Sequence, residues 1–116
     1  MTRFLIFFTL LGFLAIGSSC KSQTSKEKVD YKTAFLVDVR TPDEFAGGSV
    51  PGAVNIPLQE IDHRIDEFHG KKQIVVFCRS GSRSNQAKSL LEQAGLTNII
   101  NGVTWEQVRI NTENQL

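Results

Sequence analysis

The segment IVVFCRSGSRS, residues 74–84, decides the fold of this chain. Residues 74–77 are all apolar and mostly β-branched, which is typical of a strand buried on both faces of a parallel sheet. Residues 84–94 carry apolar side chains at helical spacing, and Gly95 follows as a helix stop. The segment therefore predicts a buried strand, a short loop and a helix, with Cys78 at the carboxyl end of the strand.

Short apolar runs and helical stretches alternate along the rest of the chain. Further strands are expected at residues 34–39, 53–56 and 98–100. Further helices are expected from Pro42, with Thr41 as N-cap, and at residues 58–68 and 103–110. This alternation predicts an α/β fold with a mainly parallel sheet and helices on both faces. In such folds, functional sites form at the carboxyl ends of the strands, where Cys78 is expected.

The loop after the strand carries the residues needed to activate a thiol. Gly81 permits a tight turn, and the small residues Ser80 and Ser82 leave backbone amides free to point inward as a nest. Arg79 and Arg83 add positive charge beside a helix N-terminus, an environment that lowers the pKa of a cysteine. The alternative is a cysteine that only completes the strand, followed by a solvated polar loop.

Cys78, Gly81 and Arg83 form a Cys-x-x-Gly-x-Arg pattern that resembles the active-site loop of rhodanese-like sulfurtransferases. The order of other segments agrees with that family over about residues 30 to 110: LVDVR with PDEF, GSVPGAVNIP, AGL and NGVTW, at residues 36–45, 48–57, 94–96 and 101–105. Ser49 stands where the family often has His, and Asn101 replaces the first of two glycines. Neither departure touches the loop.

The resemblance implies a three-layer rhodanese-like fold and a two-step reaction. Cys78 would take a sulfur atom from a small donor such as thiosulfate and pass it to cyanide or a thiol. Arg79 would contact the anionic donor, Arg83 would hold the loop and add positive potential, and the loop amides of residues 80–82 would stabilise the terminal sulfur. No metal and no organic cofactor is implied.

Several other polar residues have a structural interpretation and a weaker functional one. Asp38 and Arg40 stand at a strand end near the expected site, where they are either a buried ion pair or support for the edge of the site. His63 and His69 are expected in solvent, and Trp105 is expected to pack in the core.

Two other function classes stay open from the sequence. Cys-x5-Arg phosphatases and arsenate reductases use a related loop that cradles a tetrahedral oxyanion, but four residues, not five, separate Cys78 from Arg83. A rhodanese-like binding module without catalysis is the third class, and the presence of Cys78 argues against it.

Length and charge set further limits. The 116 residues suffice for one domain. Arg3 is the one basic residue before Cys20, so 12 basic residues remain against 12 acidic ones in the rest of the chain. This balance gives no indication of a nucleic-acid partner, which requires clustered basic charge.

The first 19 residues have the pattern of a secretory signal peptide. Arg3 precedes the mostly apolar residues 4–16, and small residues lead into Cys20. These small residues before a cysteine resemble the lipobox of bacterial lipoproteins, although Gly17 stands where that family usually has Leu. The expected organisation is a signal peptide at 1–19, a flexible tether at 20–29 and the domain at 30–116.

The lipobox resemblance implies a lipid on Cys20 that anchors the protein to the periplasmic side of a bacterial membrane. Ordinary cleavage after Ser19, which would leave a soluble periplasmic protein, stays open.

Overall fold

The structure is a computed structural model that describes residues 12, 17 and 27–116. The predicted signal peptide and lipid attachment at Cys20, with most of the predicted tether, lie outside the described residues. Within the part that is described, no helix combines the length and apolar composition needed to cross a bilayer.

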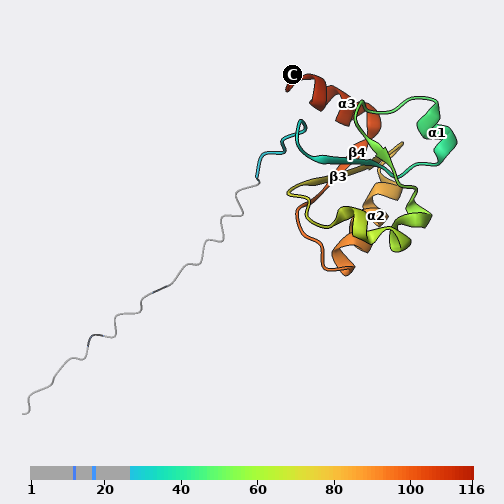
Figure 1. The fold of residues 1–116 in the computed structure, drawn as a ribbon. Helices are drawn as coiled ribbons and strands as arrows, with labels where there is room; N and C mark the ends of the chain where they lie inside the picture. Colours follow the sequence, from blue (N-terminus) through green and yellow to red (C-terminus); the bar gives the residue numbers. More distant parts are fainter. Residues whose placement is uncertain (1–11, 13–16, 18–26) are drawn as a thin grey trace, which may run out of the picture.

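The core of the fold is a four-stranded sheet in which all neighbouring strands run parallel (Figure 1). The strand order is β2-β1-β3-β4. The bounds are β1 Phe35–Asp38, β2 Val54–Asn55, β3 Ile74–Cys78 and β4 Ile99–Thr104. The prediction of an α/β fold with a parallel sheet is confirmed.

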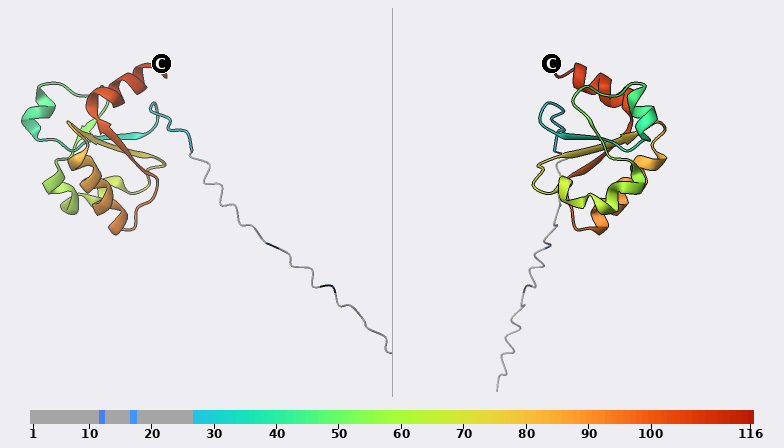
Figure 2. Two further views of the ribbon diagram at one scale, coloured as in Figure 1. Left: turned by 180° about the vertical axis from the view of Figure 1, so that it is seen from behind. Right: turned by 45° about the vertical axis from the view of Figure 1, so that its right-hand side comes forward.

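Strand β3 lies inside the sheet, and all five of its residues are buried. Its side chains alternate between the two faces: Val76 and Cys78 pack in one apolar cluster, and Val75 and Phe77 in the other. Helix α2 (Ser82–Gln93) contributes to the first cluster and helix α3 (Trp105–Glu113) to the second. Figure 2 shows α2 and α3 on opposite sides of the sheet, which is the predicted three-layer arrangement.

A short helix α1 (Pro42–Ala46) follows β1 and begins as predicted. Thr41 is its N-cap, and the Thr41 side chain accepts a hydrogen bond from the backbone of Glu44. The Glu44 carboxylate in turn accepts from the Thr41 backbone, which completes a capping box.

The predicted single helix over residues 58–68 is wrong. The segment forms two 3₁₀ helices, η1 Leu58–His63 and η2 Ile65–Phe68, separated at Arg64, which lies at φ −126° and ψ 23°. Within each piece the inward apolar side chains are three residues apart, which matches the 3.0 residues per turn of a 3₁₀ helix. His63 and His69 are exposed, as expected.

The predicted helix over residues 103–110 also starts too early, because β4 continues through Thr104. Phe77 pairs with Val103 after Val76 pairs with Asn101, so Gly102 is an extra residue in the strand, a β-bulge. A Cβ on Gly102 would lie 2.5 Å from Val108 and 3.0 Å from Val75. Glycine is therefore required where the strand crosses beneath α3.

Two glutamine side chains hold the segment that enters the domain. Gln73 accepts from the Asp30 amide at 2.9 Å and donates to the Lys28 carbonyl at 3.3 Å. Gln115 accepts from the Tyr31 amide at 2.7 Å and donates to the Val29 carbonyl at 2.9 Å. The side-chain amides of Gln73 and Gln115 thus bond to backbone groups of residues 28–31, as a neighbouring strand would.

Candidate active site

Cys78 is placed by strand β3 and by the turn that follows it. The residue is the last of β3, and helix α2 begins four residues later at Ser82. Gly81 is the N-cap of α2 and has φ +99°, a left-handed conformation that costs glycine little. The turn brings the chain back over the sulfur, so that the N-terminus of α2 points at it.

The sulfur of Cys78 is enclosed by this turn. The Gly81 amide donates to Sγ at 3.0 Å, and the thiol donates to Ser84 Oγ at 3.5 Å. Cys78 has 0% exposure, although the surface loop that follows it exposes Arg79, Ser80 and Ser82. Cys78 is the free cysteine of the described residues.

These contacts favour the thiolate over the thiol. Burial raises the pKa of the Cys78 thiol. Hydrogen bonds with the Ser84 side chain and with the backbone of Ser84, Gly81 and Ser80 lower it, and the resulting pKa lies below the ordinary value. The loop thereby makes Cys78 easier to ionise than an ordinary cysteine, and the thiolate is the reactive form of a cysteine.

The two loop arginines are in different environments. Arg79 is exposed and forms no ion pair with any residue that the structure describes. Arg83 donates from Nη1 and Nη2 to the two oxygens of Glu44, at 2.7 and 3.0 Å. Of the two arginines, Arg83 therefore has an ion-pair partner, and Arg79 has none among the described residues.

Sequence reasoning missed the contact of Glu44 with Arg83, although Thr41-x-x-Glu44 reads as a capping box. It also missed Ser84, which was expected only as the first residue of the helix. Ser84 is buried, and its hydroxyl donates to the Gly81 carbonyl at 3.0 Å as well as meeting the sulfur. A Cys-x5-Ser spacing within one strand–turn–helix unit was the available signal.

Asp38 and Arg40 form the buried ion pair that the sequence offered as one interpretation. Arg40 Nη2 donates to the Asp38 carboxylate at 2.7 Å, and both residues are buried. Ser49 Oγ donates to the same carboxylate at 2.7 Å, and the Arg40 guanidinium lies 5.1 Å from the centre of the Trp105 ring. No described hydrogen bond joins this pair to Cys78, so a role at the edge of the site stays a prediction.

Val103 closes another side of the turn. A Cβ placed on Gly81 would lie 2.8 Å from Val103 Cγ1, so the two residues are in close contact. Val103 has φ +69°, a rare conformation for a β-branched residue, and its amide donates to Asn101 Oδ1 at 2.9 Å. Strain of this kind is concentrated at functional sites in proteins.

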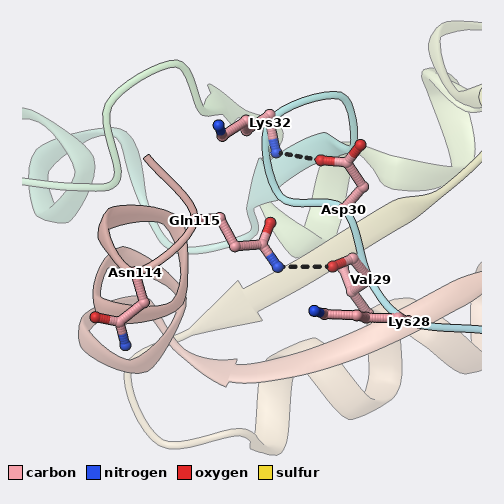
Figure 3. A pocket seen from close by; sticks show the side chains of 6 residues that line it. All are labelled: Lys28, Val29, Asp30, Lys32, Asn114 and Gln115. Carbon is pink, nitrogen blue, oxygen red and sulfur yellow. Dashed lines mark hydrogen bonds between the residues drawn. The ribbon is translucent and has the colours of Figure 1, made fainter.

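A surface pocket lies at the opposite end of the sheet from Cys78. Figure 3 shows it between the entering segment and the end of α3, with the bond from Gln115 to the Val29 carbonyl crossing it. Its lining residues are Lys28, Val29, Asp30, Lys32, Asn114 and Gln115. None of the predicted site residues lies there.

Comparison with known proteins agrees with this geometry. A profile of the rhodanese-like domain family matches residues 20–102. A sulfurtransferase of Allochromatium vinosum is 39% identical over 77 residues, which cover 66% of this chain and 72% of the relative. The thiosulfate sulfurtransferase PspE of Escherichia coli is 39% identical over 67 residues, which cover 56% of this chain and 64% of the relative.

A solved structure described as a rhodanese with anions from E. coli has a TM-score of 0.59 and 34% sequence identity. The likeness covers 64% of this chain and 89% of that chain. The range matched by the family profile, residues 20–102, contains β1, β2, β3 and the loop that carries Cys78.

Proposed function

Because this chain belongs to the rhodanese-like domain family, we propose that it is a sulfurtransferase acting through a persulfide on Cys78. The donor is thiosulfate or another carrier of sulfane sulfur, and the acceptor is cyanide or a thiol. The observation that carries the proposal is the hydrogen bond from the Gly81 amide to Cys78 Sγ at the N-terminus of α2.

In the first step, the Cys78 thiolate attacks the outer sulfur of thiosulfate. A sulfur–sulfur bond forms at Cys78, the bond within thiosulfate breaks, and sulfite leaves with its electron pair. Amides of the turn stabilise the negative terminal sulfur, as donors do in an oxyanion hole. In the second step the acceptor attacks that sulfur, and the Cys78 thiolate is restored.

The proposed roles of the other loop residues follow from their positions. Exposed Arg79 is available to contact an anionic donor. Ser80, Gly81 and Ser82 form the turn, and Arg83 fixes the first turn of α2 to α1 through Glu44. The similarity to PspE, a thiosulfate sulfurtransferase, supports thiosulfate as the first donor to test.

The test is the mass of the full chain carrying Cys20→Ala, so that Cys78 is its only thiol. Thiosulfate should add the mass of one sulfur atom, and cyanide should remove it and yield thiocyanate. Cys78→Ser in the same chain is the control, and it should fold normally while losing all turnover. Turnover by the Cys78→Ser variant would refute the assignment.

The phosphatase and arsenate reductase alternative has less support. That chemistry needs an arginine free to hold a tetrahedral oxyanion, and Arg83 is already bound through both terminal nitrogens to Glu44. The alternative of a binding module without catalysis also has less support. Binding alone requires no reactive thiol, whereas the loop lowers the pKa of Cys78.

We also propose export, with a lipid on Cys20 anchoring the domain to the periplasmic side of a membrane. Two or more acyl chains would hold the protein stably, at about 0.8 kcal/mol per buried methylene. Fractionation of bacteria expressing the full chain and Cys20→Ala tests this. Equal amounts of both in the soluble periplasmic fraction would exclude the anchor, and retention in the cytosol would exclude export.

A further inference from the structure

Glu44 and Arg83 are joined across 39 positions of sequence by a two-point ion pair. The nitrogen–oxygen distances are 2.7 and 3.0 Å, and about a third of each side chain is exposed (31% for Arg83 and 29% for Glu44). A bidentate arginine–carboxylate pair fixes the plane of the guanidinium as well as its position. The Arg83 side chain is therefore directed toward α1.

Glu44 is itself held in place by the start of α1. Its Oε1 accepts from the Thr41 amide at 3.3 Å and from Thr41 Oγ1 at 3.1 Å, in addition to Arg83 Nη1. The Arg83 contact lowers the pKa of Glu44 to about 2, so the carboxylate is charged at any physiological pH. Arg83 thus faces a permanent and fixed negative charge.

The Glu44–Arg83 ion pair reduces the positive charge that the loop presents to a ligand. Arg40 is neutralised by Asp38 and Arg83 by Glu44, so Arg79 is the loop cation without an ion-pair partner among the described residues. A guanidinium binds tetrahedral oxyanions such as phosphate, sulfate and thiosulfate through two parallel, charge-assisted hydrogen bonds, so a second unpaired arginine would strengthen their binding. A persulfide of a small thiol carries its sulfane sulfur without an oxyanion group and needs no second arginine.

We propose that Glu44 is a specificity-determining residue that withholds Arg83 from the sulfur-binding loop and so disfavours tetrahedral dianions relative to persulfides of small thiols. This inference rests on the proposed function for its donors, but the anion selectivity it assigns is a property of binding alone. With such a donor, the Cys78 thiolate attacks the outer sulfur, and the donor leaves as its thiolate.

Glu44→Gln is the informative variant. Glutamine serves in a capping box as glutamate does, so α1 keeps its cap while the carboxylate charge disappears. Arg83 then becomes available to the loop, and affinity for dianions should rise. A purely structural role for Glu44 predicts the opposite sign, because a loosened loop would bind anions less well.

The experiment measures protection of Cys78 from iodoacetamide by inorganic phosphate, in the full chain with Cys20→Ala. Glu44→Gln should lower the phosphate concentration needed for half protection about fivefold, the change expected for one partly exposed charge contact. Asp43→Asn removes an equal charge from the neighbouring, exposed residue of the same helix and should leave protection within about twofold of the parent. Unchanged or weaker protection in Glu44→Gln overturns the proposal.

The double variant Glu44→Gln, Arg83→Met removes both charges and leaves neither unpaired. Its half-protection concentration should return to that of the parent, which identifies Arg83 as the source of the gain. If Glu44→Gln alone fails to fold, the double variant decides: a clear loss of phosphate protection relative to the parent would mean that Arg83 already binds the anion, and the proposal is wrong.

Turnover then tests donor choice separately. Glu44→Gln should raise kcat/KM for thiosulfate about fivefold and leave kcat/KM for glutathione persulfide within about twofold of the parent. If no donor forms a persulfide on Cys78 while phosphate protection still responds to Glu44→Gln, the proposed function fails and the anion selectivity stands. If thiosulfate turnover is robust but neither measurement responds to Glu44→Gln, the selectivity fails and the function stands.

Discussion

Ser84 Oγ, in the first turn of α2, lies 3.5 Å from Cys78 Sγ at the end of β3. The thiol donates to this oxygen, and the Ser84 hydroxyl donates to the Gly81 carbonyl. When the thiol loses its proton, the hydroxyl can rotate and donate to the sulfur, since a hydroxyl both donates and accepts. Ser84 can therefore stabilise the thiolate directly.

Ser84→Ala should raise the pKa of the Cys78 thiol, because the side-chain bond from Ser84 is the strongest of the contacts that lower it. The rate of Cys78 alkylation as a function of pH gives this pKa. Ser82→Ala, at an exposed position of the same helix turn, is the matched control and should leave the profile unchanged. An unshifted pH profile in Ser84→Ala would show that the Ser84 hydroxyl does not lower the pKa of Cys78.

Arg79→Ala should raise the KM for thiosulfate more than Arg83→Ala does. Arg79 is exposed and unpaired among the described residues, whereas Arg83 is bound to Glu44. Arg83→Ala should instead lower the stability, by about 1 kcal/mol or less for a partly exposed pair. Steady-state kinetics and thermal melting separate the two effects, and an unchanged KM in Arg79→Ala would exclude it from donor binding.

Low pH should break the ion pair between Glu44 of α1 and Arg83 of α2, because the Glu44 carboxylate becomes protonated. The folded pKa of Glu44, about 2, is depressed from the ordinary value of 4.5, so its stabilisation is complete above pH 4.5. The contribution falls as pH drops through this window and is lost below about pH 2. The difference in unfolding free energy between wild type and Glu44→Gln should therefore shrink across this window, whereas a pH-independent difference would contradict the assigned pKa.

Gly102→Ala should destabilise the domain by about 1–3 kcal/mol, the usual cost of overpacking a core. The new methyl group would lie 2.5 Å from Val108 and 3.0 Å from Val75, both of which are buried. Gly47→Ala is the control, since Gly47 has φ −75° and its Cβ would approach nothing closer than 3.4 Å. Denaturant unfolding measures both variants, and equal stabilities would show that the bulge can shift.

The sequence alone was sufficient to predict the unit that carries the chemistry, because strand β3, the turn and α2 are contiguous. The apolar residues of β3 identify a buried strand that ends at Cys78. Gly81 and the helical pattern after it predict a tight turn and a helix directly beyond Cys78. The pairing of Glu44 with Arg83 could not be predicted in this way. Local patterns assign Glu44 and Arg83 each to the start of a helix, but only the tertiary fold brings the two side chains together.

The end of the fold was misread for a different reason. Apolar side chains at Trp105 and Val108 suit a helix, and Val103 seemed to extend it. The strand continues through Thr104 because Gly102 absorbs an extra residue beneath α3, which depends on tertiary contact. Thr104 accepts from the Gln107 amide and is the N-cap, so the helix signal was present but was read two residues too early.

The glutamine contacts at Lys28 to Tyr31 also have a mechanical consequence. Gln73 precedes β3 and Cys78 ends it, so the entry of the chain and the thiol lie at opposite ends of a strand about 16 Å long. A pull on any segment upstream of Lys28 loads the amides of Gln73 and Gln115 before it reaches the β1–β3 ladder. The turn around Cys78 therefore lies at the end of β3 away from the segment that would first take up such a load.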